Sequence, residues 1–359
     1  MSFNKYIIDC GALRYNANKI KDEIGENVKL CGVIKADAYG HGSVTIANKL
    51  KDICNFFAVA CIKEAIELRD RNILNSIIVL GIVPLSDIKY CVFNNISINI
   101  SSITQLNSVI KKLKELNLTN DKLKIHLKIN SGLNRLGFSK INDFKKALKI
   151  IDENDEILLE GIFTHFATKD NDEKFIDEQY KDFKKYVNLV KDRCIIIHNC
   201  NSFATMNKKE YRNSMVRCGF DLYGWEKGFK PVLSITSEII QINYVEDATV
   251  GYDRTYHAHN QKIAVIPIGY ADGFDRRLSN NFKVLVNGEF ANVVGNICMD
   301  LCMIDVTNIK KVDIGTKVTI LGIDGSNKIS IYDYAKVLNT SPYEILLKFK
   351  NTRMDIIEK

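Results

Sequence analysis

The sequence predicts an α/β protein, with a parallel (β/α)₈ barrel followed by a smaller, mainly β domain. Short apolar runs alternate with amphipathic helical patterns through the first two-thirds of the 359 residues. After Pro231 this alternation gives way to closely spaced strands and turns. The chain is also longer than the commonest single domain. We therefore expect a barrel over residues 1–229 and a β domain over residues 230–359.

The barrel is predicted from eight apolar runs that have the length of buried strands. They are Leu30–Ile34, Phe56–Ala60, Ile77–Leu80, Ile96–Ile100, Lys124–Ile129, Leu158–Phe163, Cys194–His198 and Met215–Phe220. Between them lie helical patterns such as Ile103–Leu116, Phe144–Ile151 and Glu173–Val190. Eight such strand and helix pairs are the number that closes a parallel barrel.

The second domain is predicted from short strand patterns separated by turns. The expected strands are Leu233–Val245, Lys262–Ile268, Lys283–Val286, Phe290–Val294, Met303–Val306 and Lys317–Leu321. Asn287-Gly288 and Asp324-Gly325 are hairpin-turn signals. One short helix is expected over Ile331–Leu338, and residues 1–10 are expected to pair with this domain.

Composition excludes several classes of function. The net charge of +7 is spread among mixed charges without a long basic run, which favours a small anionic ligand over nucleic acid. None of the ten cysteines forms a Cys-x-x-Cys pair, so no metal site is expected. Neither a signal peptide nor a membrane-spanning run is found, and we expect a cytoplasmic protein with reduced thiols.

Candidate site residues follow from barrel geometry, because barrel active sites lie at the carboxyl ends of the strands. The stretch CGVIKADAYGHG places Lys35 at the end of the first strand. The other side chains at such ends are Tyr39, Asn130, Arg135, His165, His198, Asn201, Ser202, Arg217, Gly219 and Phe220. A lysine that can form a Schiff base, with a hydroxyl and backbone N–H groups after strands 7 and 8, suits pyridoxal 5′-phosphate (PLP).

Each of these residues alone has a commonplace alternative. A strand-end lysine is usually solvated, a single histidine usually lies hydrogen-bonded in a core, and a serine such as Ser202 often caps a helix. Their joint placement at one end of the barrel is what favours a functional site.

The sequence resembles alanine racemases, which are PLP enzymes with an N-terminal barrel and a C-terminal β domain. The resemblance covers nearly the whole chain and is carried by VIKADAYGHG at 33–42, NSGLNRLGF at 130–138, GIFTHFAT at 161–168, HNCNS at 198–202, MVRCGFDLYG at 215–224, VGYDRTY at 250–256, IPIGYADGF at 266–274 and GNICMD at 295–300.

The resemblance implies a two-base racemisation of alanine that supplies D-alanine for peptidoglycan precursors. Lys35 would hold PLP as an internal aldimine and act as base on one face of the substrate carbon. Tyr252, from the second subunit of a homodimer, would be the base on the other face, with His165 beside it. Arg217 would face the pyridine nitrogen and leave it unprotonated, since arginine keeps its proton.

The remaining roles are also implied by the resemblance. The cofactor, chiefly its phosphate, would be held by Tyr39, Asn201, Ser202, Gly219 and Phe220. Arg135 and Met299 would bind the substrate carboxylate, and Tyr270 would guard the access channel. Lys128, which matches a position often carbamylated in the family, would support the site together with His198 and Asp300.

Three residues depart from the family pattern. The family commonly has aspartate where Asn130 stands and glycine where Asp253 follows the tyrosine. Most alanine racemases have tyrosine at the position of Asn351, whereas relatives that act on serine tend to have asparagine. The smaller asparagine leaves room for a hydroxymethyl group, so we expect activity on serine besides alanine. Neutral drift at this position is the simpler alternative.

Other functions are weighed against this one. A non-catalytic PLP carrier with the same barrel would lack the β domain and Tyr252. A barrel-type decarboxylase would have a carboxylate in place of Arg217. A serine/alanine racemase with serine as its main substrate, of the kind found as a module of membrane-bound proteins, remains an alternative.

Overall fold

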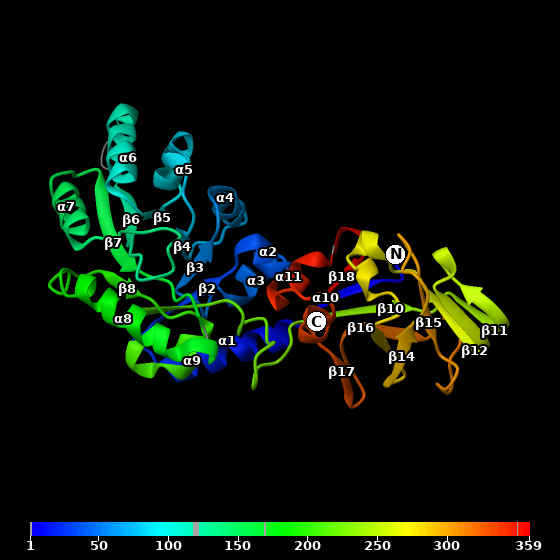
Figure 1. Cartoon of the computed structure of the whole chain (residues 1–359). Coiled ribbons are helices and arrows are strands. Elements are labelled where there is room, and N and C mark those ends of the chain that lie inside the picture. The colour runs from blue at the N-terminus through cyan, green and yellow to red at the C-terminus, as the bar shows by residue number, and fades with distance from the viewer. Residues whose placement is uncertain (1, 118–121, 169, 350) are drawn as a thin grey trace. The chain divides into compact units, whose positions relative to one another are not determined.

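The computed structural model describes residues 2–117, 122–168, 170–349 and 351–359, and its chain forms two compact units (Figure 1). One unit comprises Arg14–Ala38 and Gly42–Leu222. The other contains Tyr39–His41, the chain from Tyr223 onward and the N-terminal residues through Leu13. The first holds a closed eight-stranded parallel barrel and the second a mainly antiparallel sheet, so the predicted fold class is confirmed.

The barrel strands are short and mostly buried, as expected for parallel strands covered by helices. They are β2 (Lys29–Val33), β3 (Phe56–Val59), β4 (Ser76–Val79), β5 (Ile96–Ile100), β6 (Leu123–Lys128), β7 (Ile157–Phe163), β8 (Ile196–His198) and β9 (Met215–Cys218). Each strand pairs in parallel with the next, and β2 pairs with β9 to close the barrel. The carboxyl ends of all eight strands therefore meet at one end of the barrel.

Helices cover the outside of the barrel (Figure 1). They are α1 (Cys10–Ile24), α3 (Ser43–Leu50), α4 (Ile62–Asp70), α5 (Ile88–Phe93), α6 (Ile103–Leu116), α7 (Ile141–Asp152), α8 (Glu173–Val187) and α9 (Ser202–Asn207). Helix α6 has the predicted bounds because Ser102 caps its first turn and Asn117 ends it in the left-handed conformation. Among the described residues, no helix is both long and apolar enough to cross a membrane.

The second unit is built on one large sheet. Its strand order is β11-β12-β15-β14-β13-β16-β10-β1-β18, with β17 paired to β16. The strands are β1 (Lys5–Ile8), β10 (Leu233–Glu238), β11 (Gln241–Val250), β12 (Tyr256–Ile266), β13 (Lys283–Val286), β14 (Glu289–Val293), β15 (Cys302–Asp305), β16 (Lys317–Asp324), β17 (Asn327–Ile329) and β18 (Asp355–Glu358). The N-terminal strand β1 runs antiparallel to β10 and parallel to the C-terminal strand β18.

Strands β17 and β18 were not predicted from the sequence, and two of the predicted strands differ clearly in their bounds. The single strand expected over Leu233–Val245 is two strands, because β10 pairs with β16 whereas β11 pairs with β12. Strand β12 also begins earlier than expected, at Tyr256, since the polar run before Lys262 lacks the apolar pattern by which strands are recognised.

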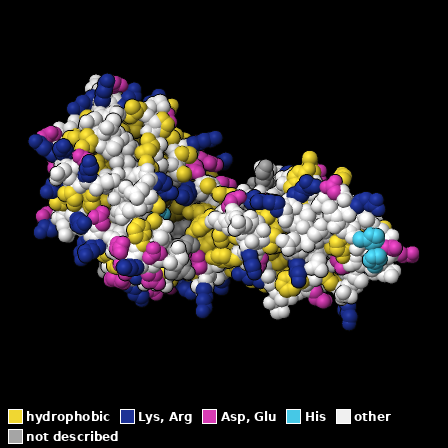
Figure 2. Space-filling model, viewed as in Figure 1, with side chains coloured by type: hydrophobic (Ala, Val, Ile, Leu, Met, Phe, Trp, Pro, Cys, Tyr) yellow, Lys and Arg dark blue, Asp and Glu magenta, His cyan; other side chains and the backbone are white. Residues whose placement is uncertain are grey.

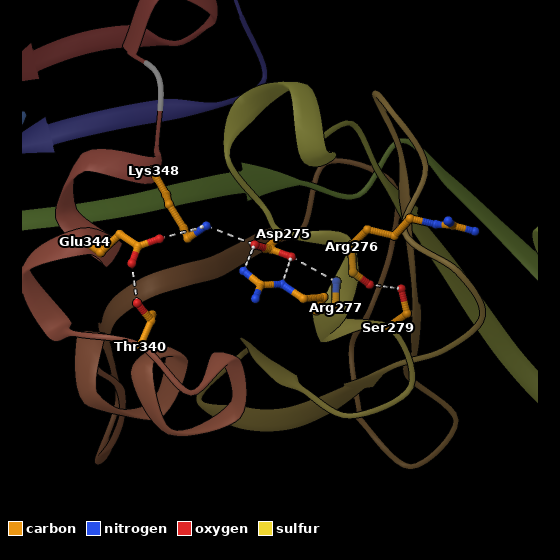
Figure 3. Close-up of polar contacts among 7 residues, drawn as sticks. All are labelled: Asp275, Arg276, Arg277, Ser279, Thr340, Glu344 and Lys348. Atoms are coloured by element: carbon orange, nitrogen blue, oxygen red, sulfur yellow. Dashed lines mark hydrogen bonds and ion pairs between the residues drawn. The ribbon is translucent and has the colours of Figure 1, made fainter.

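Polar contacts around Asp275 join one helix of this unit to one of its 3₁₀ segments (Figure 3). Helices α10 (Ile331–Leu338) and α11 (Pro342–Lys348) follow the sheet, and η6 (Arg276–Leu278) lies beside α11. Asp275 accepts hydrogen bonds from the Arg277 side chain at 2.7 and 3.0 Å and from Lys348 Nζ at 3.0 Å. These donors hold the pKa of the Asp275 carboxyl well below its usual range.

Candidate active site

Lys35 lies two residues after the last residue of β2, with Ile34 between them, and is half-buried. The four residues after it, from Ala36 to Tyr39, all have positive φ between 51° and 55°, which makes one left-handed turn. Such a turn costs about 1–2 kcal/mol per residue without Gly. It is held by Glu64, which accepts from the Ala36 N–H at 2.6 Å, and by Asp37, which accepts from the Ser43 N–H at 2.7 Å.

The barrel end around Lys35 carries a concentration of positive charge. Burial lowers the pKa of the Lys35 amine, and the charge of Arg135 lowers it further, against an opposing effect of Glu64. Lys128, at the end of β6, has a pKa lowered to about 8 by burial and by Arg135, Arg217 and Lys35. Both amines are therefore more often uncharged at neutral pH than an ordinary lysine, and an uncharged amine is the form that attacks a carbonyl.

His165 lies close to the same positively charged side chains. Burial and the charges of Arg217, Arg135, Lys128 and Lys35 lower its pKa to about 3. The ring is therefore neutral at neutral pH, and its Nδ1 lies 3.4 Å from Arg217 Nη2. A site that keeps a histidine neutral beside four cations is suited to an anionic ligand.

Arg217 is buried and begins a chain of hydrogen bonds through the barrel interior. Its Nη1 donates to His198 Nδ1 at 2.8 Å, and His198 Nε2 lies 2.9 Å from His126 Nδ1. His126 Nε2 lies 2.9 Å from Glu160 Oε2, which also accepts from the Ser97 hydroxyl. Nη2 of Arg217 donates to the Thr164 carbonyl at 2.8 Å.

The donors and acceptors available allow only one direction for these hydrogen bonds, from Arg217 toward Glu160. A guanidinium only donates, so His198 Nδ1 accepts and its proton is on Nε2. That proton is donated to His126 Nδ1, which leaves the His126 proton on Nε2, facing Glu160. Both rings are neutral in this arrangement, in agreement with a His198 pKa held well below its usual value by burial and by Arg217.

Glu160 ends the chain as an ionised carboxylate. Burial alone would raise its pKa, but the hydrogen bond from His126, the charge that this ring gains when protonated, the hydrogen bond from Ser97 and the charge of Lys124 outweigh burial and lower the pKa to about 2. Gly161 leaves space for the chain, because a Cβ there would come within 2.5 Å of His126 Nδ1. This series of hydrogen bonds thus fixes the guanidinium of Arg217 from the side of the barrel interior.

Polar groups converge after β8 and β9. The Ser202 hydroxyl accepts from the Gly219 N–H at 3.2 Å and from the Asp221 N–H at 3.5 Å. Asn201 orders the start of α9, since its side chain accepts from the Ala204 N–H at 3.0 Å. Phe220 lies in the same loop and is buried. Both N–H groups donate to the Ser202 hydroxyl oxygen, and a hydroxyl and backbone N–H groups gathered in this way are the kind of donors that bind phosphate oxygens.

Arg135 is exposed on a loop that folds back over the end of β6. The Phe138 N–H donates to the Lys128 carbonyl at 2.8 Å, and Gly137 is required there because a Cβ would lie 2.6 Å from the Asn130 nitrogen. The amide of Asn130 donates to Asn134 and Ser139, both at 3.0 Å. The loop borders an open cavity of about 510 Å³ lined by Ile82, Ser101, Ser102, Gln105, Asn130, Asn134, Arg135, Leu136 and Gly137.

The predicted tyrosine base lies in the other unit. Tyr252 begins the 3₁₀ turn η4 (Tyr252–Arg254) between β11 and β12, and its side chain is 69% exposed. Asn296 Nδ2 donates to the Tyr252 carbonyl at 3.1 Å and to the Asp253 carboxylate at 2.9 Å. Asp253 has φ of +59°, in the left-handed region that glycine adopts more easily than other residues.

Two more predicted residues lie near one another in this unit. The Tyr270 N–H donates to the Cys298 carbonyl at 3.1 Å, and the Ala271 N–H donates to the Met299 carbonyl at 3.0 Å. The side chains of Tyr270 and Met299 are 43% and 54% exposed. They are therefore available to a ligand or to a second subunit.

Asp300, Tyr39 and Asn351 complete the predicted set. Asp300 accepts from Arg353 Nη2 at 2.7 Å. The ring of Tyr39 packs 5.0 Å from Tyr223 and 6.0 Å from Tyr343, and burial raises its pKa, so its hydroxyl stays a donor. The side chain of Asn351 lies outside the part of the chain that the structure describes.

Sequence reasoning missed four residues that shape the barrel site. Glu64 holds the turn after Lys35, and His126 and Glu160 support Arg217. The ring of Phe163 lies 5.4 Å from the Arg217 guanidinium and 5.5 Å from Lys128 Nζ. Phe163 ends a predicted strand and could have been selected by position, whereas His126 and Glu160 lie within strands and carry no such signal.

Partly uncharged amines beside arginines at the mouth of a parallel barrel suit a class of barrel enzymes that bind anionic ligands. Comparisons with known proteins identify the family within this class. Family models of the alanine racemase N-terminal and C-terminal domains match residues 8–227 and 232–357. The alanine racemase of Lactococcus lactis subsp. lactis is 38% identical over 354 residues, covering 95% of this chain and 94% of its own.

Solved structures agree. The crystal structure of alanine racemase from E. faecalis has a TM-score of 0.94 at 31% identity, covering 100% of this chain and 98% of that one. The alanine racemase of Bacillus anthracis with bound L-Ala-P has a TM-score of 0.90 at 30% identity, covering 100% and 95%. The chain belongs to the alanine racemase family. It is an amino-acid racemase, an isomerase of a family whose members are PLP enzymes.

Proposed function

We propose that the protein interconverts L- and D-alanine with PLP bound at Lys35, and that Tyr252 of a partner subunit completes each site of a homodimer. The observation that carries this proposal is the lowered pKa of Lys35 at a barrel end that also holds Arg135, Lys128 and Arg217. The Bacillus anthracis relative with bound L-Ala-P supports the assignment of an alanine-like ligand.

The residues present fit the cofactor. The phosphate would be held by the Ser202 hydroxyl and the Gly219 N–H, which lie 3.2 Å apart and are hydrogen-bonded to each other, with Phe220, Asn201 and Tyr39 around it. Arg217 would face the ring nitrogen, and its guanidinium is fixed by His198 and Thr164. When bound, PLP supplies the electron sink that makes the hydrogen on the substrate α-carbon acidic.

The protein's own groups move the proton. An uncharged Lys35 amine takes the α-proton of the D-substrate, and the Tyr252 hydroxyl takes that of the L-substrate. Two bases of different kind on opposite faces allow removal on one face and return on the other, which is what inversion requires. Because Arg217 cannot give up its proton, it leaves the ring nitrogen unprotonated and favours simple proton exchange over side reactions.

Substrate binding is assigned to both subunits. Arg135 would pair with the substrate carboxylate and the backbone of the partner's Met299 would assist, while Tyr270 would narrow the access channel. Lys128, with a pKa of about 8, repels Arg135 unless the lysine amine is uncharged or modified, and Asp300 holds Arg353 in place.

Serine is the second substrate in this proposal. Asn351 is smaller than the tyrosine that most of the family has there, and its amide both donates and accepts hydrogen bonds. A pocket with room for a hydroxymethyl group still accepts alanine, because a missing small group costs only about 1–3 kcal/mol.

The test is chemical trapping combined with a substrate panel. Borohydride reduction of the holoenzyme should fix the cofactor on Lys35, and peptide mapping should identify that lysine. Lys128 is the matched internal control, since its amine also has a lowered pKa. A label on Lys128, or no racemisation of L-alanine by the native enzyme, would contradict the proposal.

A further inference from the structure

The hairpin of β11 and β12 carries a cluster of side chains that the racemase site does not use. The chain has six histidines, and the two exposed ones, His257 and His259, are both on β12. Being two residues apart on a strand, they point to the same face. Asp247 on β11 is the cross-strand partner of His259. Figure 2 shows histidine side chains grouped with acidic ones over this hairpin.

The three side chains direct their polar atoms at one point. His257 Nε2 lies 2.5 Å from Asp247 Oδ1, and His259 Nδ1 lies 3.0 Å from the same oxygen. The two imidazole rings stack with centroids 4.5 Å apart, and one ligand atom of each residue lies within 4.8 Å of the others. In a tetrahedral zinc site with bonds of about 2.0–2.1 Å, ligand atoms lie about 3.3 Å apart. Small rotations of these exposed side chains would bring the ligand atoms from within 4.8 Å to that spacing.

An ordinary surface ion pair explains the arrangement less well. Such a pair needs one histidine, contributes at most about 1 kcal/mol, and orders long side chains poorly. Here two rings face a single carboxylate oxygen, and protonating both would place like charges in stacked rings. Two neutral imidazoles and one carboxylate that share a cation satisfy all three groups.

We propose that Asp247, His257 and His259 form a surface binding site for a divalent transition-metal ion of the zinc class, with water as the remaining ligand. Two imidazoles select Zn²⁺, Ni²⁺, Co²⁺ or Cu²⁺ over Mg²⁺ and Ca²⁺, which prefer oxygen ligands. The site is remote in sequence from the barrel residues and requires none of them.

The metal joins the two strands next to the turn that holds Tyr252. Strand β12 pairs with β15 through Ile263–Ile266, so the histidines lie on the stretch beyond that contact, where β12 pairs with β11. A two-stranded ribbon has little stability of its own. A bound ion would therefore restrain η4, and this consequence, unlike the metal binding itself, rests on the proposed role of Tyr252.

The test titrates the holoenzyme with Ni²⁺ by isothermal titration calorimetry. One ion per chain should bind, and His257→Gln or His259→Gln should each weaken binding about tenfold or more. Asp247→Asn should weaken it as well. The matched control is Glu246→Gln, which removes an exposed carboxylate from the neighbouring residue on the opposite face of β11 and should leave binding unchanged.

A second measurement separates this site from the cysteines, of which Cys61 and Cys194 are exposed. Co²⁺ at this site should give a visible spectrum of nitrogen and oxygen ligation without a thiolate charge-transfer band. Ni²⁺ should also raise the unfolding temperature of the native enzyme but not that of the His257→Gln/His259→Gln variant. No binding at millimolar Ni²⁺, or equal binding by that double variant, would overturn the proposal, whatever the racemase assay shows.

Discussion

Glu160 anchors the hydrogen-bond chain behind Arg217, and Glu160→Gln removes its charge while keeping its size. The folded carboxyl has a pKa of about 2, against an ordinary value of 4.5. One pKa unit corresponds to 1.36 kcal/mol, so the carboxylate contributes at most about 3 kcal/mol to the free energy of unfolding at neutral pH. The side chain is 14% exposed, which leaves this contribution little screened by solvent.

The pH dependence gives the sharper test. Because the folded pKa lies below the unfolded one, the contribution is fully present above pH 4.5 and is lost as the pH falls toward 2. By pH 3.5 the native protein should lose about 1 kcal/mol of its free energy of unfolding through this group, and Glu160→Gln should lose none of it. The assay is urea unfolding followed by circular dichroism at pH 7 and pH 3.5.

The control for this experiment is the variant Glu67→Gln, which changes an exposed glutamate on α4. Its free energy of unfolding should change with pH as that of the native protein does. If the native protein and Glu160→Gln lose the same stability between the two pH values, Glu160 is not an ionised anchor and the directional chain is wrong. A parallel racemase assay should show a lower kcat for Glu160→Gln, since Arg217 is then less firmly held.

The remaining predictions concern catalysis, assembly, substrate and backbone. Tyr252→Phe should lose racemisation yet keep the PLP absorbance, and near-normal turnover would remove Tyr252 from the mechanism. Mixing inactive Lys35→Ala and Tyr252→Phe subunits should restore part of the activity, because one site of the heterodimer is intact; no recovery despite proven exchange would count against shared sites. Asn351→Tyr should lower kcat/KM for serine relative to alanine, and an unchanged ratio would show that Asn351 does not set specificity. Ala36→Gly should raise the free energy of unfolding by up to about 1 kcal/mol by relieving a residue at φ 53°, and a loss of stability in thermal unfolding would contradict the strain.

Features of the fold and site that depend on a local residue pattern could be predicted from the sequence. Buried strands are recognisable as apolar runs, and the end of a strand in a barrel marks the mouth, so Lys35 and Arg217 could be selected from the sequence alone. Helix α6 was predicted to the residue because its cap and its apolar spacing agree. The family resemblance then assigned roles that geometry alone leaves open.

The sequence was uninformative where contacts depend on register between strands. His126 meets His198 across β7, next to a register shift between Ile125 and His126, and a one-residue slip would turn that ring to the other face. The left-handed turn at Ala36 could not be predicted either, since alanine disfavours that conformation and only the surrounding hydrogen bonds enforce it. The hairpin with His257 was missed because its polar residues do not alternate with apolar ones.

The hydrogen-bond chain from Arg217 to Glu160 also limits where protons can travel. All its donors point the same way, and it starts at a group that never releases its proton at working pH. It therefore cannot conduct a proton between the cofactor end of the barrel and the water near Glu160. In the proposed mechanism, hydrogen isotopes incorporated at the substrate carbon therefore arrive only through Lys35 and Tyr252, and the interior of the barrel supports Arg217 without carrying protons.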